Sequence, residues 1–584
     1  MLDPLSLPVH VPRVRGGWRQ RIERVRSNAQ RSSSVSVVPH TGIMHLQDWA
    51  DGLISGPRLR RHVKASLREH GERDSHPLTV RFSRAGGNSN LDHRVHQGIM
   101  KLIKTCGFGP LLTPSTFSAD RFVLLPSTML RLIFERSQVN FRRRFGARRS
   151  SVKAFWEGLF ATPEGQRLRR SRVFLRGKTA EELSMVIPCR VHEDAGPCSK
   201  KKAVNEICWS SLLCAGSELE TRFLFRASLK QAGNVPDPEW EMFLSDFEAA
   251  QHGIAGLCED GQTWGVYLLF AQGDCEVECL SWGSPSYNDP HEVCGLCLCN
   301  RSDKPFTDMR STAAWVPTCI TTKSAHLARF KAPRHPLVDS SFMCPQLIRL
   351  DPMHVADLNG VAAIACGSCI WDLVHHDLRL GSTQAARLEV INTLKDEFYS
   401  RCRVSHKIPS LTLPNLLLDG WACLSGTYVK AANTRALVPF VLDLVLTYFD
   451  DNSTAHVATQ KAMSALDEYY RVIYRGAMFL SEAELDQLDA AVFSFGKYVM
   501  LLRNVNMEQG YLSWHVPPKL HYFMHLPAQA RLINVRFTQC YAEQSLVGKI
   551  AKVWKSCLHG PCSRTIEESA FIKYLVGVVI RLHL

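Results

Sequence analysis

The chain has 584 residues, carries 70 Lys and Arg against 55 Asp and Glu, and is 45% hydrophobic. It is too long for one ordinary domain and apolar enough for large cores, which excludes a wholly disordered or fibrous chain. The positive charge belongs to residues 1–180, which hold 33 Lys and Arg but 12 Asp and Glu, whereas residues 181–584 have a net charge of −6. This asymmetry favours a polyanion as the partner of the N-terminal part, with nucleic acid ahead of a membrane surface.

The cysteine pattern and the apolar runs bear on the compartment. Only one of the 20 cysteines, Cys106, lies in the basic part, and the others lack the dense spacing of a small secreted scaffold, which favours a reducing compartment. Residues 1–12 do not form a secretory signal, and the apolar stretches 361–370 and 436–449 are too short or interrupted by Asp443 to predict a membrane span. We therefore expect a soluble intracellular protein, and its arginine-rich start is compatible with a nuclear location.

The N-terminal third is expected to consist of an arm and a helical region. Residues 1–55 are rich in arginine and serine, which predicts a basic disordered arm. Residues 56–180 are expected to be a basic, mostly helical DNA-binding region, with helices at 59–70 and 126–136. This region includes five clustered arginines: Arg142, Arg143, Arg144, Arg148 and Arg149. For this cluster a phosphate-contacting surface and a plain solvated face both remain open.

Strand-like sequence begins near Met185 and predicts an α/β sheet within residues 181–360. Four runs rich in aliphatic and aromatic residues predict strands: 185–191, 206–213, 222–227 and 266–271. Between the last two, residues 239–252 have the apolar spacing of a helix. Asp194 and Asp274 are expected just past the ends of strands, where two carboxylates could converge on a divalent cation such as Mg²⁺.

The C-terminal part is predicted to be mostly helical. Residues 361–516 are expected to form a helical block, with helices at 384–399, 436–449, 456–474 and 481–502. Residues 517–584 are expected to complete the core, with a helix over 541–556 that carries Glu543. Three lysines repeat every third residue on this helix, which suits a phosphate-facing stripe or a plain solvated face: Lys549, Lys552 and Lys555.

Two cysteines and two histidines have the spacing of a zinc site. The two-residue gap between Cys294 and Cys297 lets both thiolates reach one tetrahedral Zn²⁺. His521 and His525 are four residues apart, so on a helix both imidazoles face the same way. A closed site of these four would attach the helical tail to the sheet. The alternatives are a pair of buried, redox-silent cysteines, or a site completed by Cys299 or Cys319 in place of the histidines.

A further motif, Asp351-Pro-Met-His354, allows two interpretations. Asp351 followed by proline is typical of a helix start, which makes His354 a residue of the first turn. Alternatively, His354 lies near a scissile phosphate as a proton donor or phosphate ligand. The acidic neighbours Glu193 and Glu276 similarly leave the metal ligands open by a position or two.

The order of these motifs resembles that of the DDE transposases of the RNase H-like fold. The nearest sub-pattern is that of the cut-and-paste group containing CACTA-type elements, in which a C-x-x-C and a D-x-x-H lie between the second Asp and a distant Glu. The ending, with His521, His525 and Glu543, is also similar to the catalytic core of Transib transposase and of the V(D)J recombinase catalytic subunit. The resemblance covers about residues 185–556 and is one of ordered motifs.

The resemblance implies an RNase H-like mixed sheet flanked by helices and interrupted by a large all-helical insertion. It implies that Asp194, Asp274 and Glu543 bind two Mg²⁺ or Mn²⁺ ions, with His354 near the active site. Cys294, Cys297, His521 and His525 would hold a structural Zn²⁺.

The implied activity is hydrolysis and then transesterification of double-stranded DNA at transposon ends and target. A nuclear homo-oligomer without a membrane partner or a small-molecule substrate is expected. Two other classes remain open: a catalytically inactive, transposon-derived DNA-binding or scaffold protein that keeps the zinc site, and an unrelated zinc-binding interaction module.

Overall fold

The computed structural model describes residues 41–70, 79–80, 82, 101, 122–200, 202–229, 238–289, 291–408, 410–450, 452–558 and 566–583. The predicted arm up to residue 40, and most of residues 71–121 of the predicted DNA-binding region, therefore lie outside the described residues. The arm does not extend to residue 55 as predicted, because Thr41–Ala50 form helix α2. Ile43 and Leu46 are buried on one side of α2, which packs against α21 (Ile566–His583).

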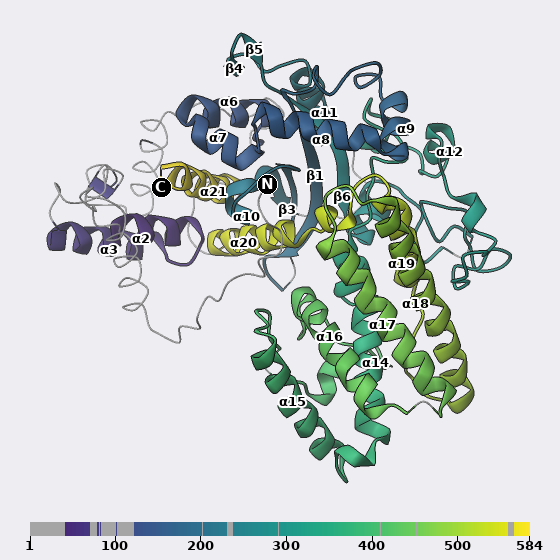
Figure 1. Cartoon of the computed structure of the whole chain (residues 1–584). Helices are drawn as coiled ribbons and strands as arrows, with labels where there is room; N and C mark the ends of the chain where they lie inside the picture. Colours follow the sequence, from purple (N-terminus) through teal and green to yellow (C-terminus); the bar gives the residue numbers. More distant parts are fainter. Residues whose placement is uncertain are drawn as a thin grey trace.

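A four-stranded mixed sheet forms the centre of one lobe (Figure 1). Its strands are β1 (Val186–Pro197), β2 (Ala203–Ser211), β3 (Phe223–Leu229) and β6 (Gly265–Gly273), in the order β3-β2-β1-β6. β1 pairs antiparallel with β2 and parallel with β6, and β2 pairs antiparallel with β3. The predicted α/β class with a mixed sheet is therefore confirmed.

The two predicted aspartates occupy different positions relative to their strands. Asp274 directly follows β6, as predicted. The prediction that Asp194 lies past the end of its strand is wrong, because Asp194 lies inside β1, which pairs with β2 as far as Pro197. The run of hydrophobic residues in the sequence ends at Val191, before the strand itself ends. After Val191, the residues on one side of β1 face a buried polar site.

Helices cover both faces of the sheet (Figure 1). On one face, Trp209 of β2 stacks on Phe145 of α7 (Gln138–Phe145) and meets Phe247 of α11 (Pro238–Ala250). On the other face lie α20 (Tyr541–Cys557), which packs against β1 and β2, and α21, which packs against β3. Where α20 covers the sheet, this face is polar, because β1 presents charged and imidazole side chains there.

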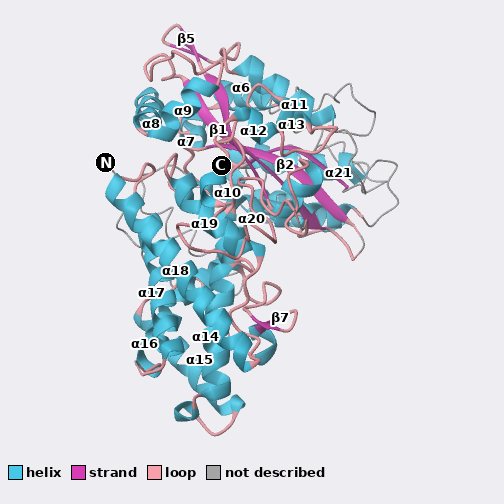
Figure 2. Ribbon diagram, turned by 90° about the vertical axis from the view of Figure 1, so that its right-hand side faces the viewer, coloured by secondary structure: helices cyan, strands magenta, loops and turns pink. Residues whose placement is uncertain are grey.

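A second lobe contains almost only helices (Figure 2). Its helices are α14 (Val361–His376), α15 (Gln384–Arg401), α16 (Ala431–Tyr448), α17 (Thr454–Arg475) and α18 (Glu482–Gln509). The sequence predicts the last four of these helices within a few residues of most of their ends. α17 begins at a Ser453 cap and α18 at a Ser481–Glu484 capping box, so serine caps start both long helices. The lobe has a hydrophobic core of its own.

The remaining elements connect these two lobes or lie around them. α19 (Pro518–Ala530) packs against α18 and α14 and then leads toward α20. The other described elements are α3 (Gly56–His70), α6 (Pro126–Arg136), α8 (Arg149–Ala161), α9 (Pro163–Ser171), α10 (Glu218–Thr221), β4 (Cys258–Glu259), β5 (Gln262–Thr263), η2 (Val277–Ser281), η3 (Val316–Thr318), α12 (Lys323–Leu327), α13 (Pro336–Asp339), η4 (Met353–Asp357), η5 (Leu378–Leu380), η6 (Leu413–Leu416), β7 (Leu417–Leu418), β8 (Trp421–Ala422) and η7 (Val535–Thr538).

One stretch of the described chain, Met353–His376, is long and apolar enough by composition to cross a membrane, with a mean hydropathy of 1.3. Only residues 361–370 of it stand out as apolar in the sequence pattern. In the structure, 83% of the apolar window is buried inside the protein, where α14 packs against α16, α17 and α19. Helix packing accounts for its composition.

Candidate functional site

One face of β1 carries a row of polar side chains beneath α20. Successive strand residues point to opposite faces, so Arg190, His192 and Asp194 share this face, and all three are buried. Glu193 points the other way, where it accepts hydrogen bonds from Trp282 Nε1 at 2.8 Å and Asn205 Nδ2 at 2.9 Å. Of the two adjacent acids, Asp194 is therefore the one on the α20 side.

Asp194 in β1 lies beside Asp274, the first residue after the parallel strand β6. Glu193 pairs with Gly273, so the next residue of each chain segment is an aspartate. Burial, and then the charge of Asp274, raise the pKa of Asp194 to about 7. Asp194 accepts hydrogen bonds from the Ala195 amide and from Gln544 Nε2. A buried carboxylate whose ionised form is disfavoured by a neighbouring acid is the kind of group that a cation stabilises.

Glu543 reaches the same face from the first turn of α20. Its Oε1 accepts from Arg190 at 2.6 Å and from Arg222 at 2.7 Å, while its Oε2 is buried without a hydrogen-bond partner among the described residues. Burial opposes ionisation of this side chain, but the two arginines outweigh it and lower its pKa to about 2. Glu543 is therefore ionised. The two arginines bind its Oε1, whereas its Oε2 has no hydrogen-bond partner among the described residues. Sequence reasoning missed both arginines because neither lies in a recognisable motif.

The Asp351-Pro-Met-His354 motif ties the η4 turn to the start of α20. Asp351 Oδ1 accepts from the Met353 amide at 3.0 Å and the Cys540 amide at 3.1 Å, and its Oδ2 accepts from the Cys540 thiol at 2.5 Å. These include the backbone bonds expected of a helix start. The sequence does not identify Cys540 as part of the site, although it stands three residues before Glu543.

His354 links this motif to the aspartates. Its Nδ1 lies 2.5 Å from Asp351 Oδ2, and its Nε2 lies 3.4 Å from the side-chain nitrogen of Gln544 that donates to Asp194. Burial opposes the charged imidazole, but Asp351 outweighs it and raises the pKa of His354. The ring therefore has a fixed orientation, with one nitrogen held by Asp351 and the other facing the Asp194 side.

Two groups of described Cys, His and acidic side chains bring their ligand atoms within 4.8 Å of one another. One is Asp351, His354 and Cys540, and the other consists of three cysteines with His521. Asp194, Asp274 and Glu543 lie around one polar face but are not among these groups. The oxygens of these three acids therefore do not all lie within 4.8 Å of one another.

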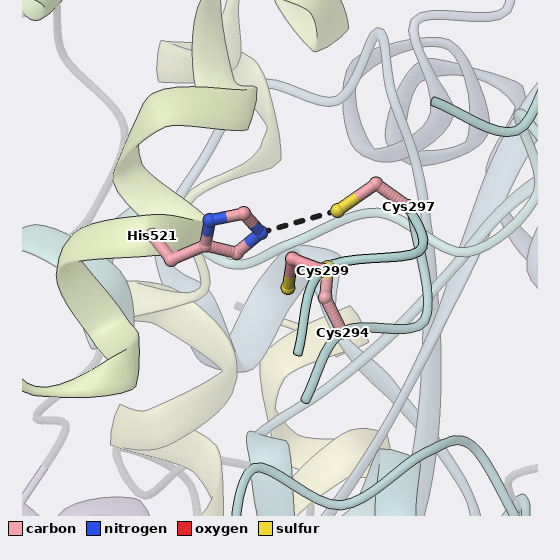
Figure 3. Close-up of side chains that lie close together, drawn as sticks. All are labelled: Cys294, Cys297, Cys299 and His521. Carbon is pink, nitrogen blue, oxygen red and sulfur yellow. Dashed lines mark hydrogen bonds between the residues drawn. The ribbon is translucent and has the colours of Figure 1, made fainter. Parts of the chain in front are cut away.

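A buried cluster of cysteines and histidine could bind a metal such as zinc (Figure 3). Cys294, Cys297 and Cys299 come from the loop after β6, and His521 comes from α19. Cys297 Sγ lies 3.3 Å from His521 Nε2. Thiolates and imidazole in a closed, fully buried arrangement are the ligands of a structural Zn²⁺ site.

His525, the other predicted ligand, lies beside this cluster. Its Nε2 is 3.6 Å from Cys294 Sγ and 3.1 Å from His521 Nε2. Its Nδ1 is 4.0 Å from Cys319 Sγ, and Trp315 packs against both histidine rings. The four predicted residues are therefore together, and Cys299 and Cys319 are additional neighbours. A tetrahedral ion uses four of these six.

The arginine cluster is not a continuous exposed surface. Arg144 is buried and donates to the carbonyls of Glu220 at 3.1 Å and Arg581 at 2.8 Å, so it is not available to a phosphate. Arg142 pairs with Glu259, Arg143 with Glu220 and Arg149 with Glu181. Arg148 is exposed at the start of α8. The predicted phosphate surface at this cluster thus loses one of its five residues.

The three lysines of α20, like the arginines, differ in their exposure and their ion pairs. Lys549 pairs with Glu218, whereas Lys552 and Lys555 are exposed. The exposed pair stands on the outer side of the helix that carries Glu543.

No family model and no curated protein matches this chain. What the site can do therefore follows from its chemistry. It combines an aspartate pair, an arginine-bound glutamate, an oriented histidine and a nearby thiol and imidazole cluster.

In metal-free buffer, Asp194 should make the protein less stable as the pH rises from about 4 to 7. Its pKa is 3.8 as an ordinary carboxyl and about 7 in the folded state, so the folded state binds more protons across this range. The loss is a few kcal/mol at most, at about 1.4 kcal/mol per pKa unit. Denaturant unfolding of the wild type and Asp194→Asn should show a difference that changes with pH. Parallel profiles would contradict this.

The purified chain should contain zinc, and Cys297→Ser and His521→Ala should each remove most of it, because a tetrahedral site missing one ligand holds the ion weakly. Elemental analysis measures this, with the buried Cys369→Ser of α14 as the control that keeps the metal. Comparing Cys299→Ser with His525→Ala identifies the fourth ligand. Unchanged zinc in all these variants would show that the cluster is not a metal site.

Proposed function

We propose that the chain is a DNA strand transferase of the DDE transposase type, which cleaves DNA and joins strands with two divalent cations. The observation that carries the proposal is the placement of three acids around one face. Asp194 in β1 and Asp274 after the parallel β6 stand side by side, and α20 brings Glu543 over the same face. The strand order β3-β2-β1-β6 is compatible with an RNase H-like sheet.

The acidic side chains fit hard cations. Asp194 is a buried carboxylate whose charged form is disfavoured by Asp274, and Glu543 has one buried oxygen without a partner among the described residues. Carboxylate oxygens of this kind are the usual ligands of Mg²⁺ and Mn²⁺. A bound cation would lower the pKa of water or of a terminal hydroxyl and stabilise the leaving oxygen of a phosphodiester.

His354 has a supporting part in this proposal. Asp351 holds its Nδ1, so the other ring nitrogen is presented toward Asp194 and Gln544. An imidazole kept in one orientation can hold a phosphate oxygen or pass a proton to a leaving group. His354 is therefore proposed to act as a proton donor or phosphate ligand at the scissile phosphate.

The thiol and imidazole cluster supports the delivery of Glu543. α19 lies against the loop of Cys294 and Cys297, and the chain then continues through η7 into α20. A structural Zn²⁺ on Cys294, Cys297, His521 and His525 would fix α19 to that loop. α20 would then start at a defined place over the sheet.

Double-stranded DNA is the proposed substrate. The net charge of residues 1–180 suits phosphate binding. Six of the predicted DNA-contacting residues are exposed: Arg142, Arg143, Arg148, Arg149, Lys552 and Lys555. A nuclear location and a homo-oligomer that holds transposon ends and target belong to the same proposal.

A second function is favoured by the arginines at Glu543. Arg190 and Arg222 both bind Oε1, as they would if this acid served only to hold the fold. The chain would then be an inactive, transposon-derived DNA-binding or scaffold protein that keeps the metal cluster. The two functions differ in whether the chain cleaves DNA.

The full chain should nick supercoiled DNA in the presence of Mn²⁺, and Asp274→Ala should slow this at least about 100-fold, because the cation site stabilises the transition state. Gel analysis of plasmid nicking measures the rate. The exposed Glu276→Ala, two residues away, is the control and should stay near the wild-type rate. If Glu276→Ala lost nicking and Asp274→Ala did not, Glu276 would be the cation ligand in place of Asp274. A wild type that binds DNA but never nicks it would favour the inactive protein.

Binding to DNA should weaken steeply with salt. Lys552→Gln with Lys555→Gln should lower the slope of log K against log salt by about 0.9 for every phosphate that the variant no longer neutralises. Fluorescence anisotropy at several salt concentrations measures it. Lys461→Gln, exposed on α17 in the other lobe, is the control and should leave the slope as it is. Affinity that does not depend on salt would contradict DNA binding through phosphates.

A further inference from the structure

Two arginines that no sequence motif singles out lie where the helical lobe meets the start of α20. Arg435 belongs to α16, and Arg536 belongs to η7, the turn that leads into α20. Both are partly exposed, and neither forms an ion pair with a described residue. Four of the predicted phosphate-contacting residues, by contrast, already pair with glutamates: Arg142, Arg143, Arg149 and Lys549.

Two tyrosine rings fix the guanidinium of Arg435. It lies 4.8 Å from the ring centroid of Tyr474 and 4.7 Å from that of Tyr541, and it donates to the Tyr474 hydroxyl. The charge of Asp357 acts on Arg435, but the two oxygens of Asp357 accept from the hydroxyls of Tyr470 and Tyr541. The guanidinium of Arg435 is therefore held in place without a carboxylate bound to it.

Arg536 contacts the same tyrosine. Its guanidinium lies 5.2 Å from the ring centroid of Tyr474, and its Nη1 donates to the Tyr474 carbonyl at 2.8 Å. Two guanidinium groups therefore share one ring. Positive charges held this close repel each other, and an anion bound by both would relieve the repulsion.

This arginine pair lies next to the proposed active site. Tyr541 is two residues before Glu543 in α20. The Tyr474 hydroxyl donates to Gln539 Oε1 at 2.7 Å. The Gln539 carbonyl in turn accepts from Arg190, which also binds Glu543. A DNA strand that reaches Glu543 would therefore pass close to the two arginines.

We propose that Arg435 and Arg536 bind the phosphate backbone of DNA beside the proposed active site. A guanidinium can bind two phosphate oxygens at once through charge-assisted hydrogen bonds, and one that is already stacked loses little further freedom when it does so. The Tyr474 and Tyr541 rings are covered by guanidinium groups, which favours phosphate contact over base stacking. This inference rests on the proposed function and adds DNA contacts outside the basic N-terminal region and α20.

Fluorescence anisotropy of the full chain with a labelled DNA duplex of random sequence tests the inference. The chelator EDTA is added so that cleavage plays no part. Arg435→Gln and Arg536→Gln should each weaken binding at least about 5-fold at low salt and lower the slope of log K against log salt by about 0.9. Arg435→Lys keeps the charge and should keep nearly the wild-type slope.

Arg471→Gln is the matched control. Arg471 is an exposed arginine of α17 that already pairs with Asp467, so the variant loses the same charge from a position outside the arginine pair. Its slope should equal that of the wild type. An equal fall in slope in Arg471→Gln would show that only the net charge matters, and would overturn the inference.

Thermal unfolding separates DNA contact from a role in the fold. If the arginines serve only to join the two lobes, the glutamine variants should melt at a lower temperature, yet bind DNA with wild-type affinity and slope well below that temperature. That result would overturn the inference. If Arg435→Gln does not fold, Arg536→Gln and Arg435→Lys carry the test, with the slopes expected above.

The outcomes also separate this inference from the proposed function. A wild type that binds DNA without nicking it, together with weakened glutamine variants, would support the phosphate contacts and contradict the transferase. Nicking by the wild type, together with wild-type binding in both glutamine variants, would do the reverse. If the wild type does not bind DNA at all, both fail.

Discussion

The compensation of buried acids on one face of the sheet is the constraint on which the rest of the site depends. Asp194, Glu206 and Glu543 are all nearly excluded from solvent there. Arg190 and Arg222 neutralise one oxygen of Glu543, whereas Glu206 has no partner among the described residues. Burial raises the pKa of Asp194 and Glu206, so each of these acids is stabilised by binding either a proton or a cation. The proposed cation chemistry follows from this imbalance.

Contacts between distant segments hold that face together. Asp351 binds the amide and the thiol of Cys540, which joins the η4 turn to the last residue before α20. The cysteine and histidine cluster joins the loop after β6 to α19. Both connections precede α20 in the path of the chain, so the position of Glu543 depends on the helical lobe as well as on the sheet.

Local pattern predicts some of these features and misses others for physical reasons. Helices such as α6 and α20 are predicted closely, because their apolar spacing and their starts are encoded within a few residues. The predicted end of β1 is too early, because a strand that turns polar on one face no longer looks like a strand. Arg190 and Glu206 escape prediction because a lone charged residue within a strand carries no motif.

The sequence by itself determined the α/β class, the charge asymmetry and the two separate ligand pairs Cys294/Cys297 and His521/His525, since composition and short spacings carry that information. That the two pairs meet is decided by the tertiary structure. Only the tertiary structure shows that Asp194, and not Glu193, faces α20, because this depends on which way the side chains of a strand point. It also decided that Arg144 is internal and that Glu543 is held by two arginines. Such pairings join residues hundreds of positions apart, and no local pattern records them.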